Sequence, residues 1–154
     1  MSLEKVLVQN KKVGYNYEIL DRFEAGIVLD GCEVKSIRES RASLVDAFAF
    51  LKGNELMVRN FYIAEYKNAK DVEQDPMRVK KLLLHRREIN KIMAMINRKG
   101  HTVVPTKVYT NQKNIIKIEL AVVTGKKKYD KRKDIKQREW EREKARILKN
   151  KGEQ

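Results

Sequence analysis

The chain has 154 residues, 42% hydrophobic and 36% charged, and its 35 Lys or Arg against 21 Asp or Glu give a formal net charge of +14. This length suits one domain with a single core, and a pI near 9.9 indicates a polyanionic partner, because cations placed on phosphates release condensed counterions. The sequence excludes a membrane-spanning helix, which needs about 20 apolar residues, and we expect no signal peptide. Its single cysteine, Cys32, excludes an intramolecular disulfide and favours the cytoplasm.

The first third of the chain predicts two strands and a short helix. Residues 15–20 alternate in polarity like a half-buried strand, and residues 25–29 resemble a second one. Gly26 suggests a bulge or a close approach of two backbones. Residues 33–39 follow Gly31 and read as a short helix.

A hairpin is expected next. The β-rich run 44–51 leads into a turn at residues 52–55, and residues 56–63 pair back on it. Residues 66–74 are polar and predict a loop.

A long basic helix is expected from residue 77 to about residue 99. Asp75 is a good N-cap, Pro76 suits the first helical position, and Gly100 suits the residue after the end. The basic residues of this segment oppose the single acid Glu88, which favours a phosphate-binding face over an ordinary solvated one. They are Arg78, Lys80, Lys81, Arg86, Arg87, Lys91, Arg98 and Lys99.

Two further strands, 102–110 and 116–122, complete a mainly β fold. Six short antiparallel strands most simply bury one face each by closing into a barrel. The prediction is therefore a small six-stranded oligonucleotide-binding (OB-like) barrel with packed helices over residues 1–124. An open α+β sandwich is the alternative.

Residues 125–154 differ from the rest of the chain. They hold thirteen Lys or Arg against six Asp or Glu, a net charge of +7, and few apolar side chains. Such a segment cannot bury enough apolar surface to offset its ordering entropy. We expect a basic C-terminal tail that is disordered when free and helical on RNA.

No constellation in the sequence supports catalysis. His85 and His101 are far apart, and neither has a second ligand at metal spacing. There is no glycine-rich phosphate loop, and the carboxylates mostly sit beside Lys or Arg, as surface ion pairs do. We expect no enzyme activity, no metal and no cofactor.

Several ordered motifs resemble the SsrA-binding protein (SmpB) family. Residues 23–26 read FEAG, and residues 31–38 read GCEVKSIR. Residues 75–88 then carry DP, R, KLLL and RE at family spacing, and residues 125–139 carry GKK, DKR, IK and RE. The resemblance covers about residues 10–149.

The resemblance implies a protein that binds the tRNA-like domain of transfer-messenger RNA and brings it to stalled ribosomes for trans-translation. In that role protein and RNA together imitate a tRNA. The implied partners are transfer-messenger RNA, the rRNA of the decoding centre and the mRNA channel, with elongation factor Tu contacted indirectly through the charged RNA. A generic OB-fold protein that binds rRNA is the alternative, and a small ribonuclease is a third reading.

The resemblance also implies two sets of contacts. The expected RNA-binding residues of the barrel are Asn10, Lys11, Glu24, Gly26, Glu33, Lys35, Leu83, His85 and Arg87. The expected ribosome contacts of the tail are Lys126, Lys127, Lys128, Tyr129, Asp130, Lys131, Arg132, Trp140, Ile147 and Leu148.

Physical roles follow for some of these residues. A carboxylate such as Glu24 can accept hydrogen bonds from base amino or imino groups, and an exposed Leu83 or His85 can cap an unstacked base. Leu83 has a competing role as a core residue, although residues 82–84 cannot all face inward. For Glu33, capping of its own helix is as plausible as RNA contact. His85 and Cys32 depart from the residues that are common in the family.

Overall fold

The computed structural model describes residues 4–69, 72–98, 100–125, 138–140 and 142–143. The chain divides into two compact units, Met1–Thr124 and Gly125–Gln154. No helix among the described residues is long and apolar enough to cross a membrane. The fold below is that of the first unit.

A closed β-barrel forms the first unit. The strands of its main sheet are β1 (Lys5–Gln9), β2 (Tyr17–Ile27), β4 (Phe48–Lys52), β5 (Glu55–Arg59), β7 (Lys80–Leu83), β8 (His101–Thr110) and β9 (Ile116–Gly125). Six of them form a ring in the order β8-β4-β5-β7-β2-β9, because β9 also pairs with β8 along its length. The ring confirms the predicted six-stranded barrel. Strand β1 adds a further pairing to β8, and β3 (Ala42–Ser43) pairs with β6 (Tyr62–Ile63) in a separate two-stranded sheet.

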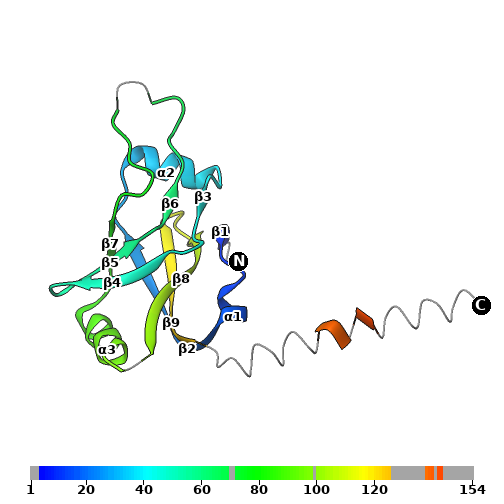
Figure 1. Cartoon of the computed structure of the whole chain (residues 1–154). Coiled ribbons are helices and arrows are strands. Elements are labelled where there is room, and N and C mark those ends of the chain that lie inside the picture. The colour runs from blue at the N-terminus through cyan, green and yellow to red at the C-terminus, as the bar shows by residue number, and fades with distance from the viewer. Residues whose placement is uncertain (1–3, 70–71, 99, 126–137, 141, 144–154) are drawn as a thin grey trace, which may run out of the picture. The chain divides into compact units, whose positions relative to one another are not determined.

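Three helices surround the barrel. Helix α2 (Gly31–Arg38) and helix α3 (Arg86–Ile96) lie towards opposite ends of the barrel, and the short α1 (Val13–Asn16) precedes β2 (Figure 1). Helix α2 buries Ile37 and α3 buries Ile92 in the main core.

Two apolar clusters hold these elements together. The main cluster lies inside the ring, and its largest fully buried apolar side chains are Phe61, Ile37, Leu44, Leu56, Leu82, Ile92, Ile118 and Leu120. Each such side chain stabilises the fold by about 1.5–3 kcal/mol. A smaller cluster of Val13, Val104, Ala121 and Val123 packs where α1 meets β8 and β9. This smaller cluster fixes α1, and with it the segment around Asn10.

Several elements in the first half differ from the sequence prediction. Segments 15–20 and 25–29 are not two strands: residues 17–20 and 25–27 belong to the single strand β2, and residues 15 and 16 to α1. The predicted run 44–51 is a strand only from Phe48, and strand β1 and helix α1 were not predicted. The hairpin of β4 and β5 is confirmed, with Gly53 at a φ of 62° in its turn.

The predicted helix 77–99 is wrong in its first half. The Asp75 side chain accepts a hydrogen bond from the Met77 N–H at 3.0 Å, which makes a turn rather than a helix start. Strand β7 follows because it pairs with β2 and β5, and this tertiary pairing overrides local propensity. Helix α3 begins only at Arg86, where the Glu88 carboxylate accepts the His85 N–H at 3.1 Å.

Because residues 77–85 are not helical, the predicted basic face of that helix does not form. Lys80 is fully buried, Arg78 pairs with Glu33, and Lys91 lies 3.0 Å from Asp21. Cations that share a helix in the prediction thus lie on different elements, and each of these three has a protein partner.

Candidate nucleic-acid interface

A hollow on the barrel wall gathers four of the nine predicted barrel residues. It has a volume of about 470 Å³ and is lined by Glu24, Gly26, Leu83, Leu84, His85, Glu88 and Lys117. These residues come from β2, β7, β9 and the start of α3. We call this surface the Glu24 hollow.

Glu24 is exposed, and one of its carboxylate oxygens is held from the barrel side. The buried Tyr109 on β8 donates its hydroxyl hydrogen to Glu24 Oε2. Burial and this hydrogen bond raise the pKa of Tyr109, so the phenol stays protonated as a donor. Among the described residues no second group donates to Glu24, so its Oε1 can accept a hydrogen bond from a ligand.

Gly26 and Leu83 form the apolar part of the hollow. The two residues are direct partners in the β2–β7 pair, and a Cβ on Gly26 would lie 3.3 Å from the Leu83 Cβ. Leu82 points into the core, whereas Leu83 is 49% exposed. Of the three consecutive leucines, Leu83 is therefore the one that faces solvent, and a side chain at Gly26 would meet the Leu83 side chain.

One cation, Lys117, and His85 line the Glu24 hollow, and Arg87 follows two residues after His85. His85 is exposed at the start of α3, and Arg87 is exposed one residue inside that helix. Lys117 lines the hollow from β9 and was not predicted as a site residue. It lies opposite Tyr109 in the β8–β9 pair, and the alternation of β9 is the sequence signal that could have placed it on the outer face.

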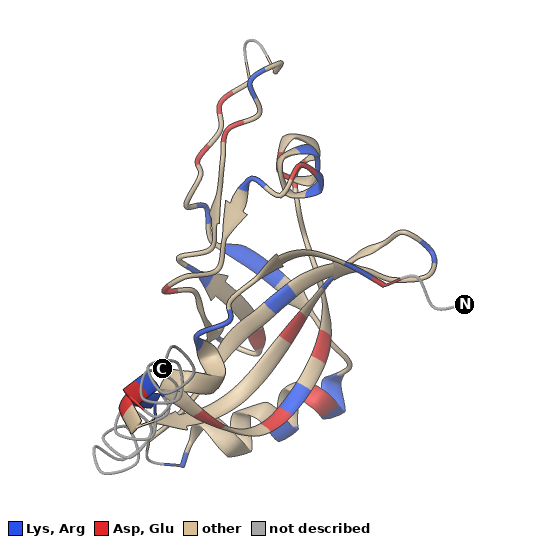
Figure 2. Cartoon of the chain, turned by 90° about the vertical axis from the view of Figure 1, so that its right-hand side faces the viewer, with Lys and Arg blue, Asp and Glu red and all other residues tan. Residues whose placement is uncertain are grey.

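A second, smaller hollow contains Asn10 and Lys11. It measures about 230 Å³ and is also lined by Arg22, Lys107 and Glu119. Thr106 donates its hydroxyl hydrogen to Glu119, and Arg22 Nη1 lies 3.4 Å from the same carboxylate oxygen. We call it the Lys11 hollow. Lys or Arg positions and Asp or Glu positions both occur on the strands of the barrel (Figure 2), so the charged positions of the barrel wall are of both signs.

Glu33 lies in a different environment. Its carboxylate accepts a hydrogen bond from the Asp30 N–H at 2.8 Å, which is the helix-capping contact expected as one of its two roles. It also accepts a hydrogen bond from Arg78 Nη2 at 2.6 Å. The Lys80 ammonium lies 3.9 Å away. Desolvation lowers the pKa of Lys80 to about 8, although the negative charge of Glu33 acts to raise it. We call these residues the Glu33 cluster.

The remaining predicted residues divide between exposed and undescribed positions. Lys35 is exposed on α2, with its Nζ 5.2 Å from the centre of the Tyr66 ring. Trp140 is 60% exposed, within the helical residues 138–140. The other predicted tail contacts lie outside the described residues: Lys126, Lys127, Lys128, Tyr129, Asp130, Lys131, Arg132, Ile147 and Leu148.

The described residues offer no group of three or more His, Cys, Asp or Glu that could hold a metal ion. His101 does not approach His85: its Nδ1 lies 3.0 Å from the Met95 carbonyl oxygen. What the hollows present is a set of hydrogen-bonding groups, an exposed leucine and cations. This is the chemistry of base and phosphate contact.

Comparison with known proteins gives consistent matches along most of the chain. A model of the SmpB protein family matches residues 7–150. The SsrA-binding protein of Wolbachia pipientis subsp. Culex pipiens is 49% identical over 95% of this chain and 98% of its own length. That of Anaplasma phagocytophilum is 50% identical over 94% and 97%. A chain in a solved structure described as "tmRNA-SmpB: a journey to the center of the bacterial ribosome" is 39% identical, with a TM-score of 0.66 over 78% of this chain and 84% of that one.

Proposed function

The chain belongs to the SmpB protein family, and we propose that it binds transfer-messenger RNA and acts with it on the ribosome in trans-translation. The observation that carries this proposal is the Glu24 hollow. It brings Glu24, Gly26, Leu83 and His85 together from three separate elements on the wall of a closed barrel.

We propose that the Glu24 hollow and the Lys11 hollow face the tRNA-like domain, where loops offer unstacked bases. Glu24 Oε1 then accepts a base amino or imino hydrogen, Leu83 caps the base, and Lys11, Lys107 and Lys117 meet phosphates. This role is binding rather than catalysis. It belongs in the cytoplasm, a reducing compartment that suits the single Cys32.

A binding assay tests the proposal. Affinity of the full chain is measured for the tRNA-like domain of transfer-messenger RNA, an elongator tRNA and an unrelated hairpin, at one fixed salt concentration. We expect the first to bind most tightly and to remain intact. Equal affinity for all three supports the generic RNA-binding alternative, and degradation of the RNA supports the ribonuclease reading.

The tail has a separate role in this proposal. Deleting residues 129–154 removes none of the residues of the two hollows, so recognition of the tRNA-like domain should persist. Tagging of stalled ribosomes should be lost, because the cationic tail then cannot fold along the anionic rRNA. The measurements are RNA affinity and tagging by the truncated chain, and normal tagging without the tail contradicts this division.

A further inference from the structure

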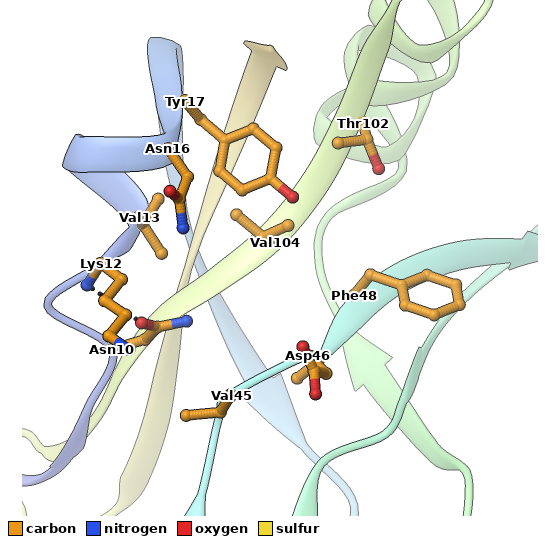
Figure 3. Close-up of a pocket in the computed structure, with 11 residues that line it drawn as sticks. Asn10, Lys12, Val13, Asn16, Tyr17, Val45, Asp46, Phe48, Thr102 and Val104 are labelled. Atoms are coloured by element: carbon orange, nitrogen blue, oxygen red, sulfur yellow. Dashed lines mark hydrogen bonds between the residues drawn. The ribbon is translucent and has the colours of Figure 1, made fainter. Parts of the chain in front are cut away.

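A third hollow, the largest of the three, lies beside the Lys11 hollow and was not part of the predicted site. It measures about 520 Å³ and lies between α1, the N-terminal half of β8 and the segment that leads into β4 (Figure 3). Asn10 and Val13 line both this hollow and the Lys11 hollow. We call it the Tyr17 pocket.

Polar side chains around the Tyr17 pocket are left without protein partners. Among the described residues, the side chains of Asn16, Asp46 and Thr102 have no hydrogen bond, ion pair or ring contact. Asn10 Oδ1 accepts the Lys12 N–H at 3.1 Å, which leaves the Asn10 amide nitrogen free to donate. The amide nitrogens of Asn10 and Asn16 point into the space in front of Asp46 (Figure 3).

The pocket also has an apolar side. The half-buried ring of Tyr17 forms one wall, with its hydroxyl directed into the space above Val104 (Figure 3). Phe48 lies on the opposite side, and Val45 is 57% exposed at the rim. The pocket thus places an exposed valine and an aromatic wall beside amides that can still donate and accept hydrogen bonds.

Asp46 adds a backbone observation. Its φ is 67°, in the left-handed region, which Asp and Asn adopt more readily than other residues apart from glycine. This conformation holds the carboxylate at the pocket, where an acid on a strongly basic protein is an acceptor for a ligand's hydrogens.

We propose that the Tyr17 pocket takes one unstacked nucleobase of the RNA that lies on the barrel, an inference that rests on the proposed function. The pocket offers amide and hydroxyl donors together with a carboxylate acceptor, which matches the mixed edge of a base rather than a phosphate. The Tyr17 ring supplies a stacking face. The cations are next to the pocket: Lys12 at its rim and Lys11 and Lys107 in the adjoining hollow, where the backbone of the same nucleotide would lie.

Three conservative variants test the pocket without removing its walls. Asn16→Ala and Tyr17→Phe each delete one hydrogen-bonding group, and Asp46→Asn keeps a residue that tolerates positive φ. Each should weaken binding of the tRNA-like RNA about 3- to 10-fold, the change that one net hydrogen bond gives. Asn90→Ala, an exposed amide on α3, is the matched control and should leave affinity unchanged.

Asp46→Asn separates base recognition from general electrostatics. It removes a negative charge, so a surface that only attracts phosphates should bind RNA more tightly after the change. Weaker binding supports base recognition, and tighter or unchanged binding overturns it. Thermal unfolding of each variant shows that the fold is retained.

Two further arms identify the ligand's source. Titration with free AMP, GMP, CMP and UMP follows the side-chain amide NMR signals of Asn10 and Asn16. If a mononucleotide shifts these signals and no pocket variant alters RNA affinity, the pocket binds a free nucleotide. That result overturns the RNA proposal. If pocket variants bind RNA normally while Leu83→Ala does not, only the pocket inference fails; if the full chain does not prefer the tRNA-like RNA, the proposed function fails first.

Discussion

Glu24 and Glu33 lie nine residues apart in the same motif-rich segment and have opposite surroundings. Glu33 is 11% exposed, with both oxygens engaged by Arg78 and Lys80 beside it. Glu24 is exposed, and among the described residues only Tyr109 donates to it. Both match the family motif, yet the first has no free acceptor for a ligand and the second does.

The difference shows how a basic protein can use its acids. The half-buried Glu33 carboxylate supplies a counter-charge to the ammonium of Lys80, which is fully buried. An exposed carboxylate held by one hydroxyl is oriented but not neutralised. We therefore interpret the Glu33 cluster as the join between α2 and β7, and the Glu24 hollow as the recognition surface.

Glu33→Gln should give the largest loss of stability. The change leaves the buried Lys80 without its carboxylate neighbour and Arg78 with only Asp30 at 3.5 Å, and removing the partner of a buried charge in this way costs about 3 kcal/mol. Urea unfolding measures the loss. Glu55→Gln, which breaks the exposed pair with Lys81 at 3.1 Å, is the matched control and should change stability by less than about 0.5 kcal/mol. Equal losses would remove the distinction between the two acids.

The stability of the wild-type chain should rise between pH 8 and pH 10. The pKa of Lys80 is lowered to about 8 in the fold from 10.5, so in this window the unfolded state binds the extra proton. The rise should reach about 2 kcal/mol, because each pKa unit corresponds to 1.36 kcal/mol. Above pH 10 the raised pKa of Tyr109 acts in the opposite direction, since only the unfolded phenol then ionises. Lys80→Met should abolish the rise measured by urea unfolding.

The sequence predicts the barrel well where one strand face is buried. Segment 116–122 alternates and appears in β9, segment 102–110 appears in β8, and the turn at Gly53 defines the hairpin of β4 and β5. The failure at residues 77–85 has a physical cause. Lys80 and Lys81 look like solvated helix residues, and only pairing with β5 and β2 reveals a strand with a buried lysine.

The site is predictable in part for a related reason. The motif resemblance points to Glu24, Gly26, Leu83 and His85, and these residues meet in one hollow because β2 and β7 pair side by side. Lys117 and the Tyr17 pocket could not be found in the same way. The position of each depends on which strands become neighbours when the ring closes. Local sequence patterns do not determine those neighbours.

Leu83→Ala should weaken binding of the tRNA-like RNA about tenfold while costing stability less than about 1 kcal/mol, because the side chain is half exposed. Ile115→Ala, which truncates an equally exposed residue outside the hollows, is the control and should change neither quantity. Fluorescence anisotropy and urea unfolding give the two values. A stability loss of about 2–5 kcal/mol would instead assign Leu83 to the core.

Tyr109→Phe should have the smallest effect, and it tests whether orientation of Glu24 matters. The variant keeps the buried ring and removes only the hydroxyl that Glu24 accepts, so stability should fall by about 1 kcal/mol. RNA affinity should fall about threefold. In the wild-type chain the hydroxyl already restricts the Glu24 side chain before RNA binds, whereas in the variant this rotamer entropy is lost only on binding. In a Glu24→Ala background the same change should leave affinity unaltered, since there is no carboxylate left to orient. Additive losses in the double variant would show that Tyr109 acts on RNA by some other route, and Glu24 would then differ from Glu33 in exposure alone.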